Sequence, residues 1–173
     1  APDDAFAGYR GLLELGYAPE KIILCGESAG ATLVLDIPLM AKAAGVPIPG
    51  AVIAMSPVTD AIAVEEGTVL EGLDSSDQVL EVYAPGHNKA DPLISPALGD
   101  LTGFPPTFLS VGGTEILLKD SLTFARNAAK AGCDVRLHVG KDMIHTYPLD
   151  LWDYPEAMTA FEEMELFLRQ MLR

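Results

Sequence analysis

The sequence predicts an α/β protein in which a mostly parallel sheet is covered by helices on both faces. Three observations support this prediction. The chain has 173 residues, the size of one domain, and 49% of them are hydrophobic, enough to build a core. Short apolar runs that suit buried strands alternate with longer stretches of helix-forming residues. Strands separated by helices pair in parallel, because each helix carries the chain back along the sheet.

The first elements follow in the order helix, strand, helix. Residues 2–15 carry apolar side chains three or four positions apart and predict an amphipathic helix, which Gly16 ends. Residues 21–25 contain a continuous apolar run, which predicts a strand buried on both faces. The Ala- and Leu-rich stretch 28–44 predicts a second helix, which we expect Pro38 to kink or divide.

The same alternation continues to the end of the chain, with one irregular stretch at residues 61–100. Within that stretch one helix is expected near 76–84, where Ser and Asp precede apolar residues. The other predicted elements are a buried strand over 51–55, a strand over 108–111, a helix over 117–131, a half-exposed strand over 135–139 and an amphipathic helix over 153–172. The sheet therefore has about four strands, and the rule of right-handed crossovers fixes its handedness.

The charge of the chain argues against two classes of partner. Lys and Arg number 11 and Asp and Glu number 25, which gives a formal net charge of −14. Such a chain repels polyanions, so neither nucleic acid nor an anionic membrane surface is an expected partner. No stretch approaches 18 uninterrupted apolar residues, since the run at 31–41 contains Asp36 and Pro38, and no membrane span is expected.

The two cysteines, Cys25 and Cys133, lie far apart in the sequence. They predict buried free thiols rather than a disulfide framework, which fits a reducing compartment. Ala1 is followed by neither the basic region nor the apolar segment of a secretory signal. Together these features predict a cytoplasmic location.

Reactive side chains follow three of the predicted strands. Ser28 follows the first strand, Glu115 follows the third and His145 follows the fourth. The carboxyl ends of parallel strands meet at one edge of a sheet, so we expect these three side chains to converge there. The chain order of serine, carboxylate and histidine, with the serine in a G-x-S-x-G segment, is the order found in α/β-hydrolases.

The serine lies in the segment Gly26-Glu27-Ser28-Ala29-Gly30, between a buried strand and a helix. Such a tight turn strains the serine backbone, and the flanking glycines let neighbouring backbone approach without a Cβ clash. The hydroxyl would stand at a helix N-terminus, whose dipole favours negative charge, and Ala29 N–H would donate to an oxyanion. A tight-turn serine that caps the helix is the alternative. A dinucleotide loop is disfavoured, because G-x-G-x-x-G requires glycine where Ser28 stands.

Three histidines compete for the role of base. His145 is preferred because it follows a strand end, whereas His138 lies on the outward face of its strand, where we expect it to be solvated. His87 is expected in a loop. No spacing of these histidines indicates a metal site, and neither a metal nor an organic cofactor is expected.

Several carboxylates compete for the role of acid. Glu115 is preferred as the first carboxylate after the third strand, and Asp120, five residues further on, is the alternative. Asp142 is expected to shape the histidine loop, and Asp60 and Asp91 are expected to cap or brace loops.

These segments together resemble the hormone-sensitive-lipase-like carboxylesterases and lipases, a branch of the α/β-hydrolases. The matching segments are Gly26–Gly30, Ser56-Pro57 with Asp60, Asp91-Pro92 with Ser95-Pro96, Pro105–Thr107, Val111–Ser121 and Asp142–His145. The resemblance implies a serine esterase that acts on short- to medium-chain carboxylic esters. It implies that Ser28 attacks the ester, that His145 transfers the proton and that Glu115 orients the imidazole.

One family feature is missing from this sequence. The His-Gly-Gly-Gly motif, whose backbone amides complete the oxyanion hole, belongs upstream of Ala1. By resemblance, residues 1–173 are the C-terminal portion of a single α/β-hydrolase domain. The strand at 21–26 would then form an apolar sheet edge, so we expect an N-terminal companion segment or self-association there. Two alternatives stay open: a non-catalytic ligand-binding protein on the same scaffold, and a fragment inactive because missing oxyanion donors cost roughly 10²–10³ in rate each.

Overall fold

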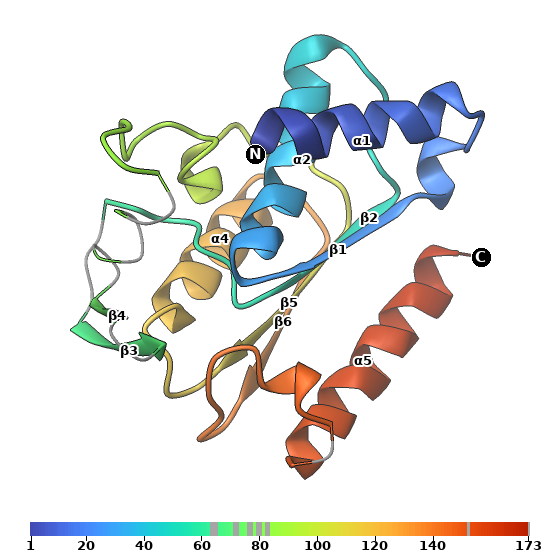
Figure 1. Cartoon of the computed structure of the whole chain (residues 1–173). Coiled ribbons are helices and arrows are strands. Elements are labelled where there is room, and N and C mark those ends of the chain that lie inside the picture. Colours follow the sequence, from blue (N-terminus) through green and yellow to red (C-terminus); the bar gives the residue numbers. More distant parts are fainter. Residues whose placement is uncertain are drawn as a thin grey trace.

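The structure, a computed structural model, describes residues 1–62, 66–70, 73–75, 78, 81, 84–151 and 153–172 (Figure 1). Its centre is a four-stranded sheet in the order β1-β2-β5-β6 in which all neighbours are parallel. The strands are β1 (Ile23–Glu27), β2 (Ala51–Met55), β5 (Thr107–Gly112) and β6 (Val135–Gly140). The main helices are α1 (Pro2–Glu14), α2 (Ser28–Ala44), α4 (Leu118–Lys130) and α5 (Pro155–Met171). The predicted α/β class and the parallel sheet of about four strands are confirmed.

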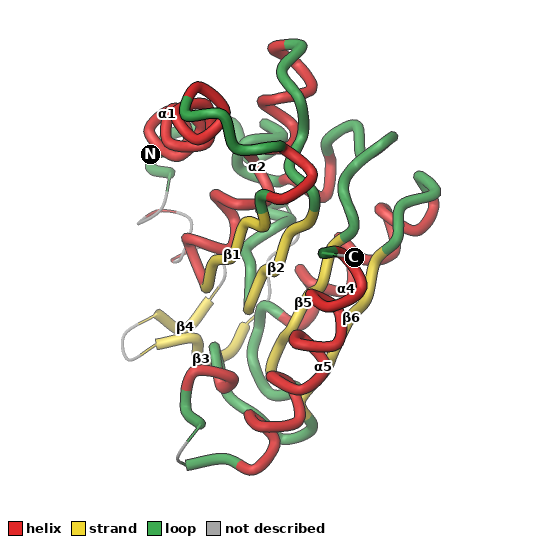
Figure 2. Tube along the Cα trace, turned by 90° about the vertical axis from the view of Figure 1, so that its right-hand side faces the viewer, coloured by secondary structure: helices red, strands yellow, loops and turns green. Residues whose placement is uncertain are grey.

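Helices cover both faces of this sheet, as the sequence predicts. On one face, α2 and α4 pack against the strands through Leu35 and Phe124, which are fully buried. On the other face, α5 packs against them through Phe167, whose ring lies 5.8 Å from that of Phe108 on β5. Figure 2 shows α5 lying along β5 and β6. Helix α1 packs on the outer side of α2, where Tyr9 is buried.

The two central strands form the most deeply buried part of the chain. Every residue of β2 and of β5 is buried, because each of these strands has a neighbour on both sides and a helix layer on at least one face. The outer strands β1 and β6 are only partly buried. Within the described strands, β1 pairs with β2 alone, so its outer edge is open.

Short elements connect these layers. They are the 3₁₀ helices at Pro19–Lys21, Pro96–Leu98 and Tyr147–Leu149, and an antiparallel hairpin of β3 (Glu66–Leu70) and β4 (Leu73–Ser75). The sequence did not predict this hairpin in the irregular stretch 61–100. The helix expected near 76–84 falls largely outside the described residues, of which Gln78 and Glu81 are helical. The first strand begins at Ile23 rather than at position 21, since the 3₁₀ helix precedes it.

Two further expectations need correction. Of the two effects expected of Pro38, division of the helix is wrong, because α2 runs unbroken from Ser28 to Ala44 and ends at Gly45, whose φ is 65°. Cys25 is exposed rather than buried, because α5 lies over β5 and β6 and leaves this part of β1 open. Cys133 is half-buried, and both cysteines are free thiols, as predicted.

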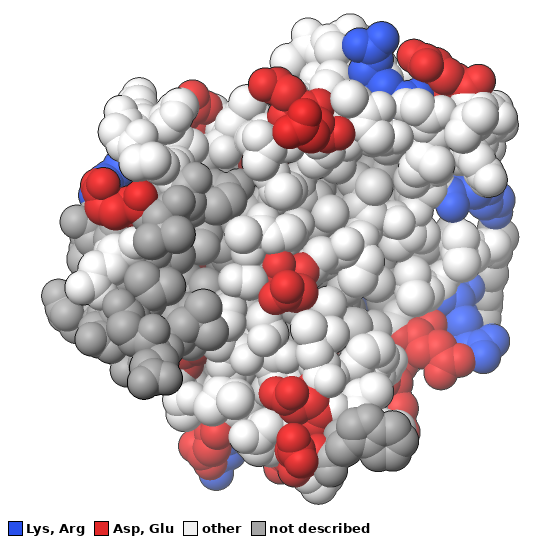
Figure 3. All heavy atoms as spheres, viewed as in Figure 1, with Lys and Arg blue, Asp and Glu red and all other residues white. Residues whose placement is uncertain are grey.

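The surface carries the excess of acidic residues that the composition requires. On the face seen in Figure 3, acidic side chains are spread among neutral ones and basic side chains lie at the margins. None of the helices in the described part of the chain combines the length and the apolar character needed to cross a bilayer.

Candidate active site

Ser28 stands at the junction of β1 and α2 in a strained backbone conformation. Its φ is 50°, in the left-handed region that non-glycine residues rarely occupy. A Cβ added to Gly26 would lie 2.3 Å from the carbonyl oxygen of Gly30, so only glycine fits at position 26. A Cβ on Gly30 would meet nothing within 4 Å. The close approach therefore requires glycine at position 26, whereas Gly30 contributes only the carbonyl oxygen that a side chain at position 26 would meet.

The two neighbours of Ser28 differ in their contribution to the turn. Glu27 has an extended backbone and an exposed side chain, so the sharp change of direction falls on Ser28 itself. Ala29 lies in the first turn of α2, where backbone N–H groups have no partner within the helix. Its N–H is therefore available to an oxygen bound next to Ser28, at the positive end of the helix dipole.

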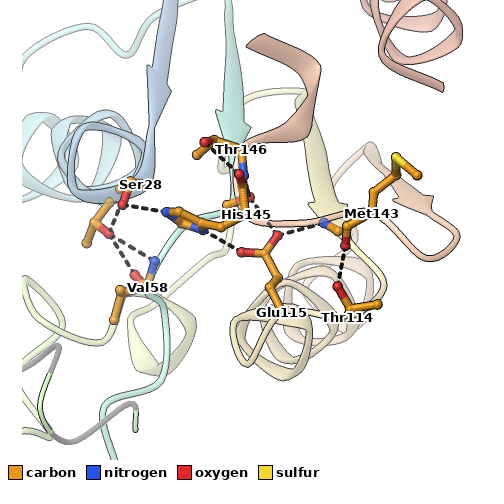
Figure 4. A network of polar contacts seen from close by, with 10 residues as sticks. Ser28, Val58, Thr114, Glu115, Met143, His145 and Thr146 are labelled. Atoms are coloured by element: carbon orange, nitrogen blue, oxygen red, sulfur yellow. Dashed lines mark hydrogen bonds and ion pairs between the residues drawn. The ribbon is translucent and has the colours of Figure 1, made fainter. Parts of the chain in front are cut away.

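Ser28, His145 and Glu115 form one hydrogen-bonded chain (Figure 4). His145 Nε2 lies 3.0 Å from Ser28 Oγ, and His145 Nδ1 lies 2.5 Å from Glu115 Oε2. A carboxylate only accepts hydrogen bonds, so Nδ1 carries the proton and Nε2 can accept from the Ser28 hydroxyl. The side chains of His145 and Glu115 are 7% and 1% exposed, which shields their interaction from water.

The second carboxylate oxygen of Glu115 is held by two donors. Gly112 N–H donates to Oε1 at 2.6 Å, and Ser56 Oγ donates to it at 2.7 Å. Ser56 is fully buried and follows β2 directly. Sequence reasoning did not give Ser56 a role at the site, although its position after a strand of the same sheet is the signal that led to the other three residues.

The loops that carry Glu115 and His145 are bonded to each other through their backbones. Thr114 donates from both its N–H and its hydroxyl to the carbonyl oxygen of Met143, at 3.2 and 2.7 Å. A Cβ added to Gly112 would lie 2.4 Å from the carbonyl oxygens of Met143 and Ile144. The two loops are therefore packed directly against each other.

Asp120, the alternative acid, lies outside the chain that contains Ser28. Its Oδ1 accepts the backbone N–H groups of Thr59 and Asp60 at 2.7 and 2.8 Å. Burial raises the pKa of Asp120 to about 6, against the lowering effect of these two hydrogen bonds and of Lys119. Its place in the structure is a brace between α4 and the turn after β2.

The other two histidines lie away from Ser28. His138 is mostly covered, which corrects the expectation from its alternation along β6 that it is solvated. Its side chain is 14% exposed, and Nδ1 lies 2.8 Å from Glu163 Oε2 on α5, because α5 covers this face of β6. His87 is exposed in a loop.

The remaining carboxylates lie in loops. Asp142 is exposed at φ 58° in the histidine loop. Asp60 and Asp91 each accept a backbone N–H two residues ahead, the loop-bracing role that we expected for them. Across the described residues, no cluster of three or more His, Cys, Asp or Glu side chains could hold a metal ion.

Comparison with known proteins places this chain in a family. Residues 1–149 match the family described as "alpha/beta hydrolase fold". An acetyl-hydrolase from Streptomyces hygroscopicus is 37% identical over 98% of this chain and 59% of its own length. An esterase from Acinetobacter venetianus is 33% identical over 96% of this chain and 58% of its own length. The chain thus spans less than two thirds of the length of these relatives.

Solved structures agree with the sequence relatives. An esterase from the bacterial hormone-sensitive lipase family superposes with a TM-score of 0.89 at 32% identity, over 99% of this chain and 60% of that chain. An esterase soaked with p-nitrophenyl butyrate superposes with a TM-score of 0.89 at 29% identity, over the same shares of the two chains. The family resemblance predicted from the sequence is confirmed: the chain belongs to the α/β-hydrolase fold family, in its hormone-sensitive-lipase-like branch.

Proposed function

We propose that this chain carries the reacting groups of a carboxylic-ester hydrolase. The observation that supports this most strongly is the hydrogen-bonded chain from Ser28 through His145 to Glu115. A serine hydroxyl is a weak nucleophile until a neighbouring base takes its proton, and His145 Nε2 lies within reach to do so. The names of the relatives, acetyl-hydrolase and esterase, agree with this chemistry.

The reaction proceeds in two halves. Ser28 Oγ attacks the ester carbonyl carbon while its proton passes to His145 Nε2, and Glu115 stabilises the resulting imidazolium through Nδ1–H. His145 then returns the proton to the leaving alcohol as the carbon–oxygen bond breaks. In the second half, water attacks the acyl-serine and loses its proton to His145, which returns it to Ser28 as the carboxylic acid departs. Ala29 N–H donates to the oxyanion in both halves.

The substrates that we propose are esters with short- to medium-chain acyl groups. The acetyl-hydrolase relative and the neighbour soaked with p-nitrophenyl butyrate support acyl groups of a few carbons. Turnover of p-nitrophenyl acetate, butyrate and decanoate should then fall with chain length. Faster turnover of decanoate than of butyrate would contradict the proposed length.

We further propose that residues 1–173 form the C-terminal portion of one α/β-hydrolase domain and that the open edge of β1 pairs with an N-terminal companion segment or with a second copy. Ile23 is only partly buried and Cys25 is exposed on this strand, and an unpaired edge of this kind is a template for another strand. Amide hydrogen exchange tests the pairing: if the β1 amides that point away from β2 exchange freely in a monomeric protein, the pairing proposal is wrong.

A fluorophosphonate probe tests the proposed nucleophile directly. The probe should label Ser28, and labelling should be lost in Ser28→Ala and greatly slowed in His145→Ala. If the probe labels Ser28 and the chain also turns over p-nitrophenyl esters, the results support a working hydrolase. If the probe labels Ser28 but no ester is turned over, they support a fragment that lacks oxyanion donors. Absence of any labelling in the folded chain would refute the proposed nucleophile and favour a ligand-binding role.

A further inference from the structure

The turn that follows β2 contains a buried serine that contacts two of the three loops of the proposed site. Ser56 Oγ donates to Glu115 Oε1 at 2.7 Å and accepts the backbone N–H of Thr146 at 3.1 Å. Thr146 is the residue after His145. One hydroxyl group therefore bonds both the carboxylate of the acid and the backbone that carries the imidazole.

We propose that Ser56 is a positioning residue for the proposed reaction: it holds Glu115 and His145 in the geometry in which the carboxylate meets Nδ1. This inference rests on the proposed function for its catalytic meaning. Ser56 touches neither a substrate nor Ser28, so its effect passes through the Glu115–His145 pair.

The donors and acceptors available to Ser56 fix the direction of its two hydrogen bonds. Ser56 has one hydroxyl proton, and the Thr146 N–H occupies an acceptor position on the same oxygen, so the proton is left for Glu115. Oε1 of Glu115 then accepts from Ser56 and Gly112, which leaves Oε2 facing His145. Without the Ser56 hydroxyl, Glu115 loses a donor that limits its rotation, and a backbone N–H next to His145 loses its acceptor.

The turn itself is anchored to α2, which begins at Ser28, and to α4, which follows the loop of Glu115. Thr32, one helical turn after Ser28 on α2, donates from Oγ1 to the carbonyl oxygen of Val58 at 2.9 Å and accepts Val58 N–H at 3.1 Å. On the other side, Asp120 on α4 holds the N–H groups of Thr59 and Asp60. Figure 4 shows the hydrogen bonds of Val58 next to the Ser28–His145 contact. Ser56 thus sits on a turn that is fixed relative to both helices.

The backbone of Ser56 is strained. Its φ is 51°, a conformation that costs a non-glycine residue of order 1–3 kcal/mol and persists where the surroundings dictate it. Glycine would adopt the same backbone without this cost. Glycine would therefore relieve the strain but, like alanine, would remove the hydroxyl that bonds Glu115 and the Thr146 N–H.

This contrast defines the experiment. Ser56→Ala and Ser56→Gly both remove the hydroxyl, but only glycine relieves the strain, so the glycine variant also keeps the test valid if the alanine variant does not fold. Ser121→Ala on α4 is the matched control, because Ser121 is equally buried and its hydroxyl has no hydrogen-bond partner among the described residues. Two readouts are used: the rate at which a fluorophosphonate labels Ser28, and the low-field proton resonance of His145 Nδ1–H.

We expect both Ser56 variants to slow labelling by roughly 10–100-fold, the effect of a small misplacement of reacting groups. The Nδ1–H resonance, assigned by its loss in His145→Gln, should shift or broaden in both, and Ser121→Ala should change neither readout. A Ser56→Gly protein with the unaltered resonance would overturn the inference. If the unsubstituted chain is not labelled at all, the proposed function fails, but the resonance still decides whether Ser56 holds the pair.

Discussion

Replacing Asp36 by asparagine should stabilise the chain at neutral pH and leave it nearly unchanged at pH 4. Asp36 lies on α2 with a fully buried side chain, and neither carboxylate oxygen has a hydrogen-bond partner among the described residues. Burial first, and then the charge of Asp91, raises the pKa of Asp36 from 3.8 to about 8. At neutral pH the folded chain therefore keeps a proton on Asp36 that the unfolded chain releases.

The sign and size of the effect follow from this difference. The folded-state pKa lies above the unfolded one, so the free energy of unfolding falls as pH rises from about 4 to about 8. Neutral pH lies about three units above the unfolded pKa, and each unit corresponds to about 1.4 kcal/mol. Because of Asp36, the free energy of unfolding is therefore about 4 kcal/mol lower at pH 7 than at acid pH, where Asp36 is protonated in both states. This is a large part of the 5–15 kcal/mol typical of a domain. Asparagine is nearly the same size and cannot ionise, so it removes this loss.

Urea unfolding of the two proteins at pH 4, 5.5, 7 and 8.5 measures the effect. The difference between Asp36→Asn and the unsubstituted chain should grow steadily over this range. Asp100→Asn is the control, because Asp100 is an exposed carboxylate whose pKa is lowered to about 2, chiefly by its hydrogen bond from Lys42, so asparagine there gives no gain. A difference for Asp36→Asn that is the same at every pH, or a loss of stability at pH 7, would refute the reasoning.

Two further pairs of substitutions test the site more directly. Gly26→Ala should destabilise the chain by more than the roughly 1–3 kcal/mol of ordinary overpacking, because the added methyl meets backbone at 2.3 Å, whereas Gly30→Ala should melt close to the unsubstituted protein. Thermal unfolding compares the two, and equal losses would contradict the close approach at Gly26. Glu115→Gln should slow phosphonate labelling of Ser28, since amide and imidazole no longer form a charge-assisted pair, whereas Asp120→Asn should label at nearly the normal rate. A neutral Glu115→Gln combined with a slow Asp120→Asn would reverse the assignment of the acid.

The placement of the site follows from topology, which is why sequence could anticipate so much of it. Ser28, Glu115 and His145 each come after a strand, and a parallel sheet brings all such positions to one edge. The strands themselves could be predicted because β2 is a continuous apolar run and β5 is mostly apolar, as suits strands that are buried along their whole length. The roles of the three side chains in catalysis stay predictions that the labelling experiment decides.

What the sequence could not supply depends on contacts between distant residues. The role of Ser56 needs a positive φ and a carboxylate that lies 59 residues away, and neither leaves a local pattern. His138 alternates with apolar neighbours like a surface residue, but α5 packs over it and provides Glu163 as its partner. The exposure of Cys25 has the same cause, since it depends on which strands α5 covers.

Because Cys25 is exposed on β1, the rate at which its thiol is alkylated can report on the state of that edge of the sheet. A thiol-reactive reagent should modify Cys25 ahead of the half-buried Cys133, whose Sγ donates to the carbonyl oxygen of Leu101. Cys25 is exposed, but partial desolvation by the surrounding chain still raises the pKa of its thiol, so mildly alkaline solution, which forms the thiolate, favours the modification. A strand that docks alongside β1 would slow the alkylation of Cys25 relative to Cys133. The ratio of the two rates, read by mass spectrometry, would then follow occupancy of that edge without any label being engineered into the chain.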